Sequence, residues 1–247
     1  MKMIILAGGT KSAISEGSED VPKPLLQIGG KPLLWHIMKH AALYGIREFI
    51  ICGGYKIEAI KDYFLDFYIY QSDILVDTGE NTVKILDRHT ENWSVEIVDT
   101  GIKAMPTERV EQVLTLAGDT FFVTYGDCLS DVSLNDMRAF HEKEGKEITV
   151  AVAKPTGRKT PLHFLDRQHS KWESGDNFWT SAGIFLMQRN AFADDNWRRG
   201  DLEDILIGRS VAAYRHGGFF STIETLRDKS NAEAMWSKGI APWVDTL

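Results

Sequence analysis

Apolar positions in the first part of the chain alternate between short continuous runs and helical spacing. Residues 3–7 are all apolar and are followed by a pair of glycines. Residues 48–52 are similar, with four apolar residues after Glu48 and a second glycine pair behind them. Such runs are typical of parallel strands buried on both faces. Residues 33–44 and 56–65 instead carry apolar side chains three and four positions apart, which predicts amphipathic helices. A strand, helix, strand, helix order predicts an α/β fold with right-handed crossovers.

This rhythm changes between residues 72 and 101. Three short apolar segments separated by polar turns predict strands near residues 74–76, 83–86 and 95–98. We interpret 72–101 as an excursion from the sheet, a hairpin flap that makes subunit contacts. Further along, the pattern predicts helices at 107–116, 201–207 and 229–237 and strands at 121–125, 148–153 and 211–214. No internal repeat or Pro/Ser-rich linker divides the chain, so we expect a single domain over residues 1–247.

Composition narrows the class of protein. The 247 residues are 43% hydrophobic and 26% charged, as in ordinary globular proteins that bury a sizeable core. The net charge of −7 disfavours non-specific nucleic-acid binding. Cys52 and Cys128 lie in apolar or glycine-rich surroundings, which indicates buried thiols rather than a disulfide framework. No signal segment and no membrane-spanning apolar run is evident, so we expect a cytoplasmic protein.

Two glycine pairs follow the first two predicted strands. Gly8-Gly9 and Gly53-Gly54 would lie together at the carboxyl rim of the sheet, where such folds bind ligands. Glycines let the backbone come close to a ligand, and successive N–H groups can face phosphate oxygens. Lys23, held between two prolines, presents an ammonium suited to a polyphosphate. A glycine pair by itself is weak evidence and is equally consistent with a simple turn.

Asp127 is the strongest candidate for a metal ligand. It follows the predicted strand 121–125 and Gly126, so its carboxylate would point at the rim that carries Gly8-Gly9. Magnesium is commonly held by one or two carboxylates together with substrate phosphates. A turn aspartate is the alternative. Asp131, a second acidic residue nearby, is as consistent with a helix-capping role as with function, and so is Ser133.

Several motifs together resemble one family, the sugar-1-phosphate nucleotidylyltransferases. The matching segments, in order, are Ala7-Gly8-Gly9, Pro22-Lys23-Pro24, the run from Ile28 to Met38, Gly53-Gly54-Tyr55-Lys56, Val98-Asp99-Thr100-Gly101, Thr124-Tyr125-Gly126-Asp127, Thr225-Leu226-Arg227-Asp228-Lys229 and Ala241-Pro242-Trp243. Each alone is unspecific, but their order and spacing are strong evidence. The resemblance implies a Rossmann-like three-layer fold with a mixed, largely parallel sheet of the nucleotide-diphospho-sugar transferase type.

The resemblance also implies an activity. An Mg²⁺-dependent homo-oligomeric enzyme would join CTP to a phosphorylated small molecule, giving a CDP-linked product and pyrophosphate. Asp127 and Glu224 would hold the metal, and Lys23 and Lys11 would act at the phosphates. The nucleotide site would comprise Leu6, Ala7, Gly8, Gly9, Lys23, Gly53, Gly54, Tyr55, Tyr125 and Gly126. The acceptor would contact Lys171, Ser181 and Gly183.

The chain departs from the family pattern at both substrates. Lys11 stands where the signature loop usually has its third glycine, and Ala13 stands where it has an arginine that contacts the phosphates. Lys171 lacks the glutamate and proline that usually flank the family's acceptor lysine. Ser181-Ala182-Gly183 replaces an asparagine-containing stretch. Two alternatives therefore stay open beside the usual activity, namely a cytidylyltransferase for a different acceptor and a catalytically weak homologue with a regulatory or scaffold role.

Overall fold

The computed structural model describes residues 1–9, 21–88, 91–154, 179–193, 199–207 and 209–244. Its centre is a seven-stranded sheet in the order β12-β10-β11-β8-β1-β4-β7, with only β11 antiparallel to its neighbours among these strands. The strands are β1 (Lys2–Leu6), β4 (Glu48–Gly53), β7 (Ser94–Asp99), β8 (Thr120–Tyr125), β10 (Ile148–Ala153), β11 (Thr180–Gln188) and β12 (Ala212–His216). The predicted mixed, largely parallel sheet is therefore confirmed.

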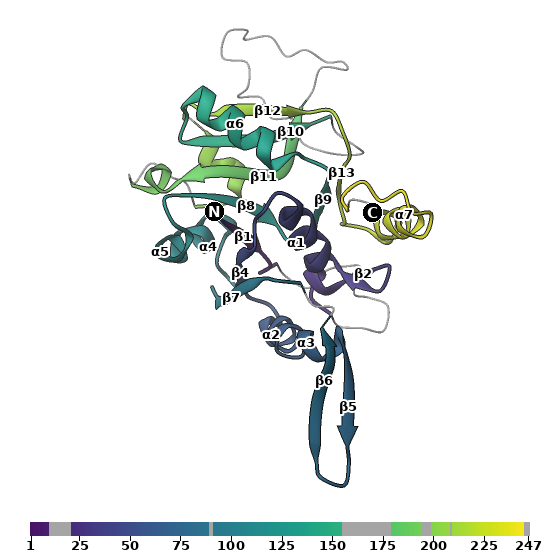
Figure 1. The fold of residues 1–247 in the computed structure, drawn as a ribbon. Coiled ribbons are helices and arrows are strands. Elements are labelled where there is room, and N and C mark those ends of the chain that lie inside the picture. The colour runs from purple at the N-terminus through teal and green to yellow at the C-terminus, as the bar shows by residue number, and fades with distance from the viewer. Residues whose placement is uncertain (10–20, 89–90, 155–178, 194–198, 208, 245–247) are drawn as a thin grey trace.

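Two apolar clusters cover the two faces of this sheet. Side chains alternate along a strand, so Met3 and Ile5 of β1 join one cluster, whereas Ile4 and Leu6 join the other. The first cluster includes α1 (Leu33–Leu43) and α6 (Leu134–Glu144). The second includes α4 (Pro106–Gln112), α5 (Leu114–Ala117) and the 3₁₀ turn η5 (Leu202–Leu206). Figure 1 shows the resulting three layers.

The first helices match the predicted ranges. α1 begins directly after Pro32, and Gly45 follows its C-cap residue Tyr44 with φ of +81°, a conformation that glycine adopts without strain. The second predicted helix is α2 (Ile57–Leu65), which continues into the short α3 (Phe67–Tyr70). The expected crossover from β1 to β4 joins parallel strands, and the connection from β4 to β7 does the same.

The excursion is shorter than predicted. β5 (Ser72–Asp77) and β6 (Thr82–Arg88) form an isolated hairpin that projects from the body (Figure 1). β7, which we had assigned to the same excursion, instead pairs with β4 as the edge of the main sheet. Its half-buried Val95 and Ile97 pack on the first cluster and Val98 packs on the second. Burial on both faces places this strand in the sheet.

Other differences concern the ends and types of elements. The helix predicted at 107–116 is broken at Val113 into α4 and α5, and the segment predicted as a helix at 201–207 is a 3₁₀ turn. α7 (Leu226–Ser237) begins three residues before the predicted start, because Thr225 caps it by accepting from the Asp228 N–H. The short strands β2 (Gln27–Ile28), β3 (Lys31–Pro32), β9 (Cys128–Ser130) and β13 (Phe220–Thr222), the 3₁₀ turns η2 (Lys23–Leu25) and η4 (Arg189–Phe192), and the strand β11 were not predicted. No helix among the described residues is long and apolar enough to cross a membrane.

Candidate active site

The carboxyl ends of β1, β4 and β8 meet because these strands are parallel neighbours in the sheet. Two backbone hydrogen bonds hold the segments just beyond them together: the Ala7 N–H donates to the Cys52 carbonyl and the Gly126 N–H donates to the Leu6 carbonyl, both at 2.9 Å. A cavity of about 710 Å³ opens there. Its walls include the predicted residues Leu6, Ala7, Gly8, Gly9, Lys23, Tyr55, Tyr125, Gly126, Asp127 and Glu224.

Gly53 and Gly54 have a different place from the one predicted. Neither lines this cavity, and Gly54 instead borders a neighbouring hollow with Asp99 and Lys103. Gly53 packs against Ile57, where an added Cβ would lie 2.4 Å from the side chain. The second glycine pair therefore allows close packing of β4 on α2 and α4, while Tyr55 reaches the cavity wall.

An ion pair forms part of the cavity wall. The Lys23 ammonium lies 2.9 Å from Oδ2 of Asp127, and the two side chains are 27% and 19% exposed. Lys23 opens the turn η2 between two prolines, which stiffen its backbone. Asp127 follows β8 and precedes β9, as the sequence predicted. The structure thus joins two candidate residues that lie far apart in the chain.

Glu224 reaches the same cavity through a two-stranded ribbon. β9 pairs antiparallel with β13, and the ladder extends to a bond from the Ile223 N–H to the Asp127 carbonyl at 2.9 Å. Glu224 therefore follows directly on the partner of Asp127. Its own N–H donates to the Asp228 carboxylate at 3.2 Å, at the start of α7.

These two carboxylates suit Mg²⁺. Both carboxylates line the same cavity and offer hard oxygen ligands, and Mg²⁺ usually takes one or two carboxylates and completes its shell with water and substrate phosphates. Among the described residues no group of three or more His, Cys, Asp or Glu forms a self-sufficient metal cage. The donor set therefore fits an ion that arrives with a phosphorylated ligand better than it fits a permanently bound structural metal.

A second cavity of about 480 Å³ shares Tyr125, Asp127 and Glu224 with the first. It contains the predicted acceptor residues Ser181 and Gly183, which lie at the start of β11. Gly183 has φ of +69°, and a Cβ there would lie 2.6 Å from the sulfur of Cys128. The two carboxylates therefore line both of two adjoining hollows.

Tyr125 forms part of the wall between the hollows. Its hydroxyl donates to Glu203 at 2.7 Å and accepts from the Leu202 N–H at 3.0 Å. Burial, with the nearby Glu203 carboxylate, raises the pKa of Tyr125 far above its ordinary value. The phenol therefore stays protonated and fixes the ring against η5.

Arg109 is a site residue that sequence reasoning missed. It lies on α4, is 3% exposed and donates to the carbonyls of Gly8 at 2.6 Å and Gly53 at 2.9 Å. A Cβ on Gly8 would lie 2.0 Å from the guanidinium, so this glycine is required for the contact. Burial lowers the Arg109 pKa from its ordinary value. The available signal was helical spacing. Arg109 comes four residues before the apolar Val113, so the two side chains share one face of the predicted helix.

Three sequence-predicted positions lie outside the described residues. They are Lys11 and Ala13 of the signature loop and Lys171 of the acceptor region.

The chain is similar to known proteins along nearly its whole length. The family model described as nucleotidyl transferase matches residues 2–164. Glucose-1-phosphate cytidylyltransferase of Salmonella typhimurium is 36% identical over 98% of both chains, and the probable enzyme of that name from Bacillus subtilis is 34% identical over 98% of this chain and 99% of its own.

Solved structures share the fold at lower identity. HddC from Yersinia pseudotuberculosis complexed with GMP-PN has a TM-score of 0.69 at 20% identity, covering 95% of this chain and 99% of its own. The inositol-1-phosphate CTP transferase from T. maritima has a TM-score of 0.66 at 14% identity, covering 96% and 95%. With the family model matching well over half of the chain and relatives above 30% identity along nearly all of it, this protein belongs to the nucleotidyl transferase family.

Proposed function

We propose that this protein is an Mg²⁺-dependent cytidylyltransferase that joins CTP to a phosphorylated small molecule. The observation that carries the proposal is the position of Asp127, paired with Lys23 and shared by two adjoining cavities. The similarity to glucose-1-phosphate cytidylyltransferases along nearly the whole chain supports CTP as donor and a sugar-1-phosphate or related phosphate as acceptor.

The reaction requires little covalent chemistry from the protein. A phosphate oxygen of the acceptor attacks the α-phosphorus of CTP, a new P–O bond forms, and the bond to the bridging oxygen breaks to release pyrophosphate. Catalysis then rests on positioning and on neutralising charge. Asp127 and Glu224 would hold Mg²⁺, which would offset the negative charge of the phosphates. Lys23 supplies an ammonium on the cavity wall, and Lys11 is proposed as a second cation from the signature loop.

Arg109 orients the phosphate loop in this scheme. The carbonyl and N–H groups across one peptide bond point in opposite directions. Because the Gly8 carbonyl accepts from Arg109, the N–H of Gly9 points away from the guanidinium. Arg109 thereby orients the Gly9 N–H toward the side of the loop opposite the guanidinium, where it can donate to a phosphate oxygen.

The acceptor is proposed to occupy the second cavity. Ser181 and Gly183 line it. Lys171 is proposed to contact the acceptor phosphate, as the family resemblance implies. Cys128 also lines this cavity, where the resembling family usually has glycine, so its thiol takes up space beside Asp127. This substitution favours an acceptor of altered shape.

Pyrophosphate release tests the proposal directly. The wild-type protein should release pyrophosphate with CTP, Mg²⁺ and at least one member of a panel of phosphorylated sugars, polyols and amino alcohols. CTP with Mg²⁺ should raise the melting temperature more than ATP or GTP does, because a ligand that binds only the native state stabilises it. An equal response to all triphosphates would contradict the cytidine assignment.

A catalytically weak regulatory homologue is the second candidate. Ala13, which stands where the family has a phosphate-contacting arginine, favours it, because alanine has no guanidinium fork for phosphate. Binding of CTP without pyrophosphate release from any acceptor would support this candidate over the enzyme.

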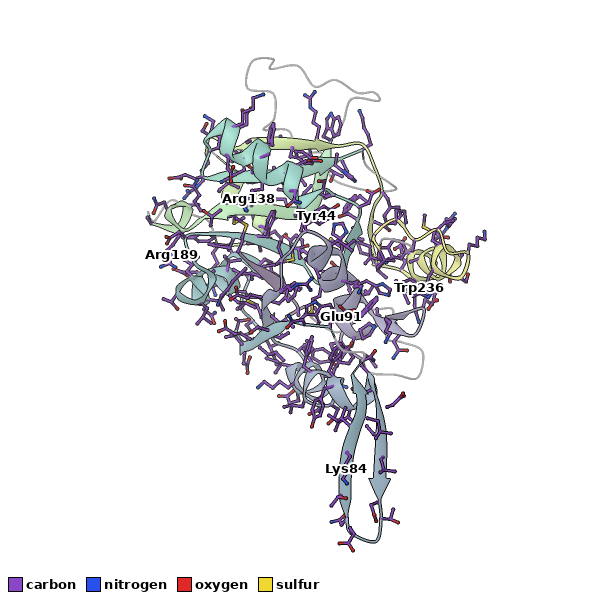
Figure 2. The ribbon with its side chains drawn as sticks, in the orientation of Figure 1. Tyr44, Lys84, Glu91, Arg138, Arg189 and Trp236 are labelled. Carbon is purple, nitrogen blue, oxygen red and sulfur yellow. The ribbon has the colours of Figure 1, made fainter. Side chains whose placement is uncertain are left out.

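We further propose that the protein is a homo-oligomer joined through the β5–β6 hairpin. Leu75, Val76, Val83 and Leu86 on this hairpin are 50–64% exposed. A two-stranded hairpin is marginally stable by itself in water and needs packing against another surface. Figure 2 shows Lys84 on β6 well away from the body of the molecule. A second copy of the chain is the proposed partner.

A further inference from the structure

The ribbon that carries Asp127 and Glu224 is closed at its far end by a polar lock. We define the carboxylate ribbon as residues 127–131 paired with residues 219–223, the strand that leads into Glu224. Between the two ends, β9 and β13 contribute three facing residue pairs, Cys128 with Thr222, Leu129 with Ser221 and Ser130 with Phe220. At the far end the Asp131 N–H donates to the Phe219 carbonyl at 3.2 Å.

The lock consists of Asp131 and His216. Oδ1 of Asp131 accepts from the Phe219 N–H at 2.6 Å and lies 2.8 Å from Nε2 of His216. His216 is 9% exposed, and the same nitrogen lies 3.1 Å from the Phe219 carbonyl. A Cβ on Gly218 would lie 2.5 Å from the Asp131 carboxylate, so the turn is folded tightly against it.

His216 connects this lock to the main sheet. It is the last residue of β12 and faces Ala153 of β10 in a parallel pair. The chain then turns through the glycines 217 and 218 and enters β13. Asp131 therefore joins the start of β13 to the sheet edge from which the chain has just come.

Asp131 does not cap α6. That role belongs to Ser133, whose hydroxyl accepts from the Asp136 N–H at 3.2 Å. Asp131 also lines neither of the two cavities of the candidate site. Its carboxylate is thus committed to the ribbon and to His216.

A ribbon of three residue pairs needs such a lock. Short two-stranded ribbons are marginally stable, and a slip of one residue in pairing turns every side chain to the opposite face. At about 3.3 Å per residue, Asp131 lies roughly 13 Å along the strand from Asp127. The register of β13 on β9 decides where Glu224 stands relative to Asp127, because the two residues come from distant parts of the chain.

We propose that Asp131 is a positioning residue for the metal-binding pair, acting through the carboxylate ribbon and His216. It fixes the register that places Glu224 beside Asp127, without touching substrate or metal. This inference rests on the proposed metal role of those two carboxylates.

The main test compares Asp131→Ala with Ser133→Ala. Both remove a side-chain acceptor of one backbone N–H, two residues apart, but only the first acts on the ribbon. We expect Asp131→Ala to raise the Mg²⁺ concentration for half-maximal pyrophosphate release at least fivefold, with the KM for CTP at saturating Mg²⁺ changed less than twofold. Ser133→Ala should leave both values within twofold of wild type while lowering the melting temperature.

Two readouts do not depend on turnover. Binding of Mn²⁺ in the presence of CTP, followed by electron paramagnetic resonance, should weaken at least fivefold in Asp131→Ala. Hydrogen exchange at the Ile223 amide should become faster, while exchange in β1 stays unchanged. His216→Ala should repeat both effects, and Asp131→Asn, which keeps an acceptor for the Phe219 N–H, should recover part of the loss.

The outcomes separate this inference from the proposed function. A folded Asp131→Ala variant with wild-type Mg²⁺ dependence and Mn²⁺ binding overturns the inference, and so does an equal loss in Ser133→Ala. If wild-type protein binds Mn²⁺ but turns over no acceptor, the proposed reaction fails and the Mn²⁺ and exchange results still decide the role of Asp131. If Asp131→Ala does not fold, His216→Ala and Asp131→Asn decide it by the same criteria.

Discussion

The Lys23 ammonium lies 2.9 Å from Oδ2 of Asp127, and both residues line the cavity at the carboxyl ends of β1 and β8. The contact places a positively charged group beside the carboxylate that we propose as a metal ligand. Lys23 thus offsets the charge of Asp127, and its ammonium lines the cavity in which we propose that the phosphates bind. Removing either charge should therefore affect turnover more than folding.

Asp127→Asn should abolish metal-dependent pyrophosphate release and leave the melting temperature within a few degrees of wild type. Asparagine keeps the shape of the side chain but removes the charge that an Mg²⁺ ligand needs. Asp119→Asn is a suitable control, because this carboxylate is 99% exposed and remote from both cavities. Turnover within tenfold of wild type, about 1.4 kcal/mol, would show that Asp127 is not the metal anchor.

Arg109→Lys should destabilise the protein and weaken nucleotide binding together. Lysine cannot serve the carbonyls of Gly8 and Gly53 at once with the geometry of a guanidinium fork. Hydrogen bonds to charged groups contribute about 1.5–3 kcal/mol each, so we expect a loss of about 2–3 kcal/mol in the free energy of unfolding.

Urea unfolding and the CTP-induced rise in melting temperature measure the two effects of Arg109→Lys. Arg138→Lys, at an exposed position of α6, serves as control. A stable variant with an unchanged response to CTP would mean that Arg109 does not shape the phosphate loop.

The signature loop is tested by paired substitutions. If Lys11 has taken over phosphate contact, Lys11→Ala should slow turnover by two orders of magnitude or more, about 3 kcal/mol of transition-state stabilisation. Ala13→Arg should raise activity in a weakened relative of the sugar enzymes and should be neutral or harmful in an enzyme adapted to another acceptor. A silent Lys11→Ala, together with no turnover by Ala13→Arg on any acceptor, would favour the regulatory candidate.

Acidification should destabilise the fold through buried histidines. Burial lowers the pKa values of His36, His40 and His141 below the ordinary 6.5. The Trp243 indole N–H donates to Nδ1 of His36 at 3.1 Å, so that nitrogen must be unprotonated, and Nε2 carries the proton that goes to the Ile28 carbonyl. A second proton on His36 would break the contact with the C-terminal segment.

The direction in which stability changes with pH follows from proton uptake by the folded and unfolded chains. In the unfolded chain these histidines take up protons as the pH falls below about 6.5, whereas in the folded chain they resist uptake until a lower pH. Their contribution to stability is therefore complete above pH 6.5 and declines as the pH falls toward the lowered pKa values. Urea unfolding at pH 8.0, 6.5 and 5.5 should show this decline, and His141→Gln should reduce it. A flat profile over this range would contradict the prediction.

Substitutions on the β5–β6 hairpin should change the oligomeric state of the protein. Leu75→Asp with Leu86→Asp places charges on the exposed surface that we propose as the contact with a second copy. The double variant should shift the molecular mass in sedimentation equilibrium toward that of a monomer, and should keep its melting temperature at low protein concentration. Lys143→Asp, at an exposed position of α6 away from the hairpin, makes the same change in net charge and controls for added negative charge alone. Wild-type protein that sediments as a monomer would refute the proposed contact.

Much of the fold follows from local signals in the sequence. Continuous apolar runs identified β1, β4 and β8, and helical spacing identified α1 and α2, because each pattern reports the burial of its own residues. Lys23 and Asp127 were predicted from local signals as well. Asp127 comes just after a buried parallel strand, and Lys23 is held between two prolines, so neighbours in the chain set the position of each residue. Gly8 and Gly9 were predicted for the same reason, because they come just after β1.

The tertiary structure decided whatever depends on contacts between distant segments. Periodicity could not place β7 in the main sheet rather than in the flap, because an apolar strand has the same pattern beside any neighbour. It could not find Arg109, whose charge is buried only because carbonyls from two other loops accept from it. The register between β9 and β13, which brings Glu224 to Asp127, is likewise a property of strand pairing and not of either strand alone.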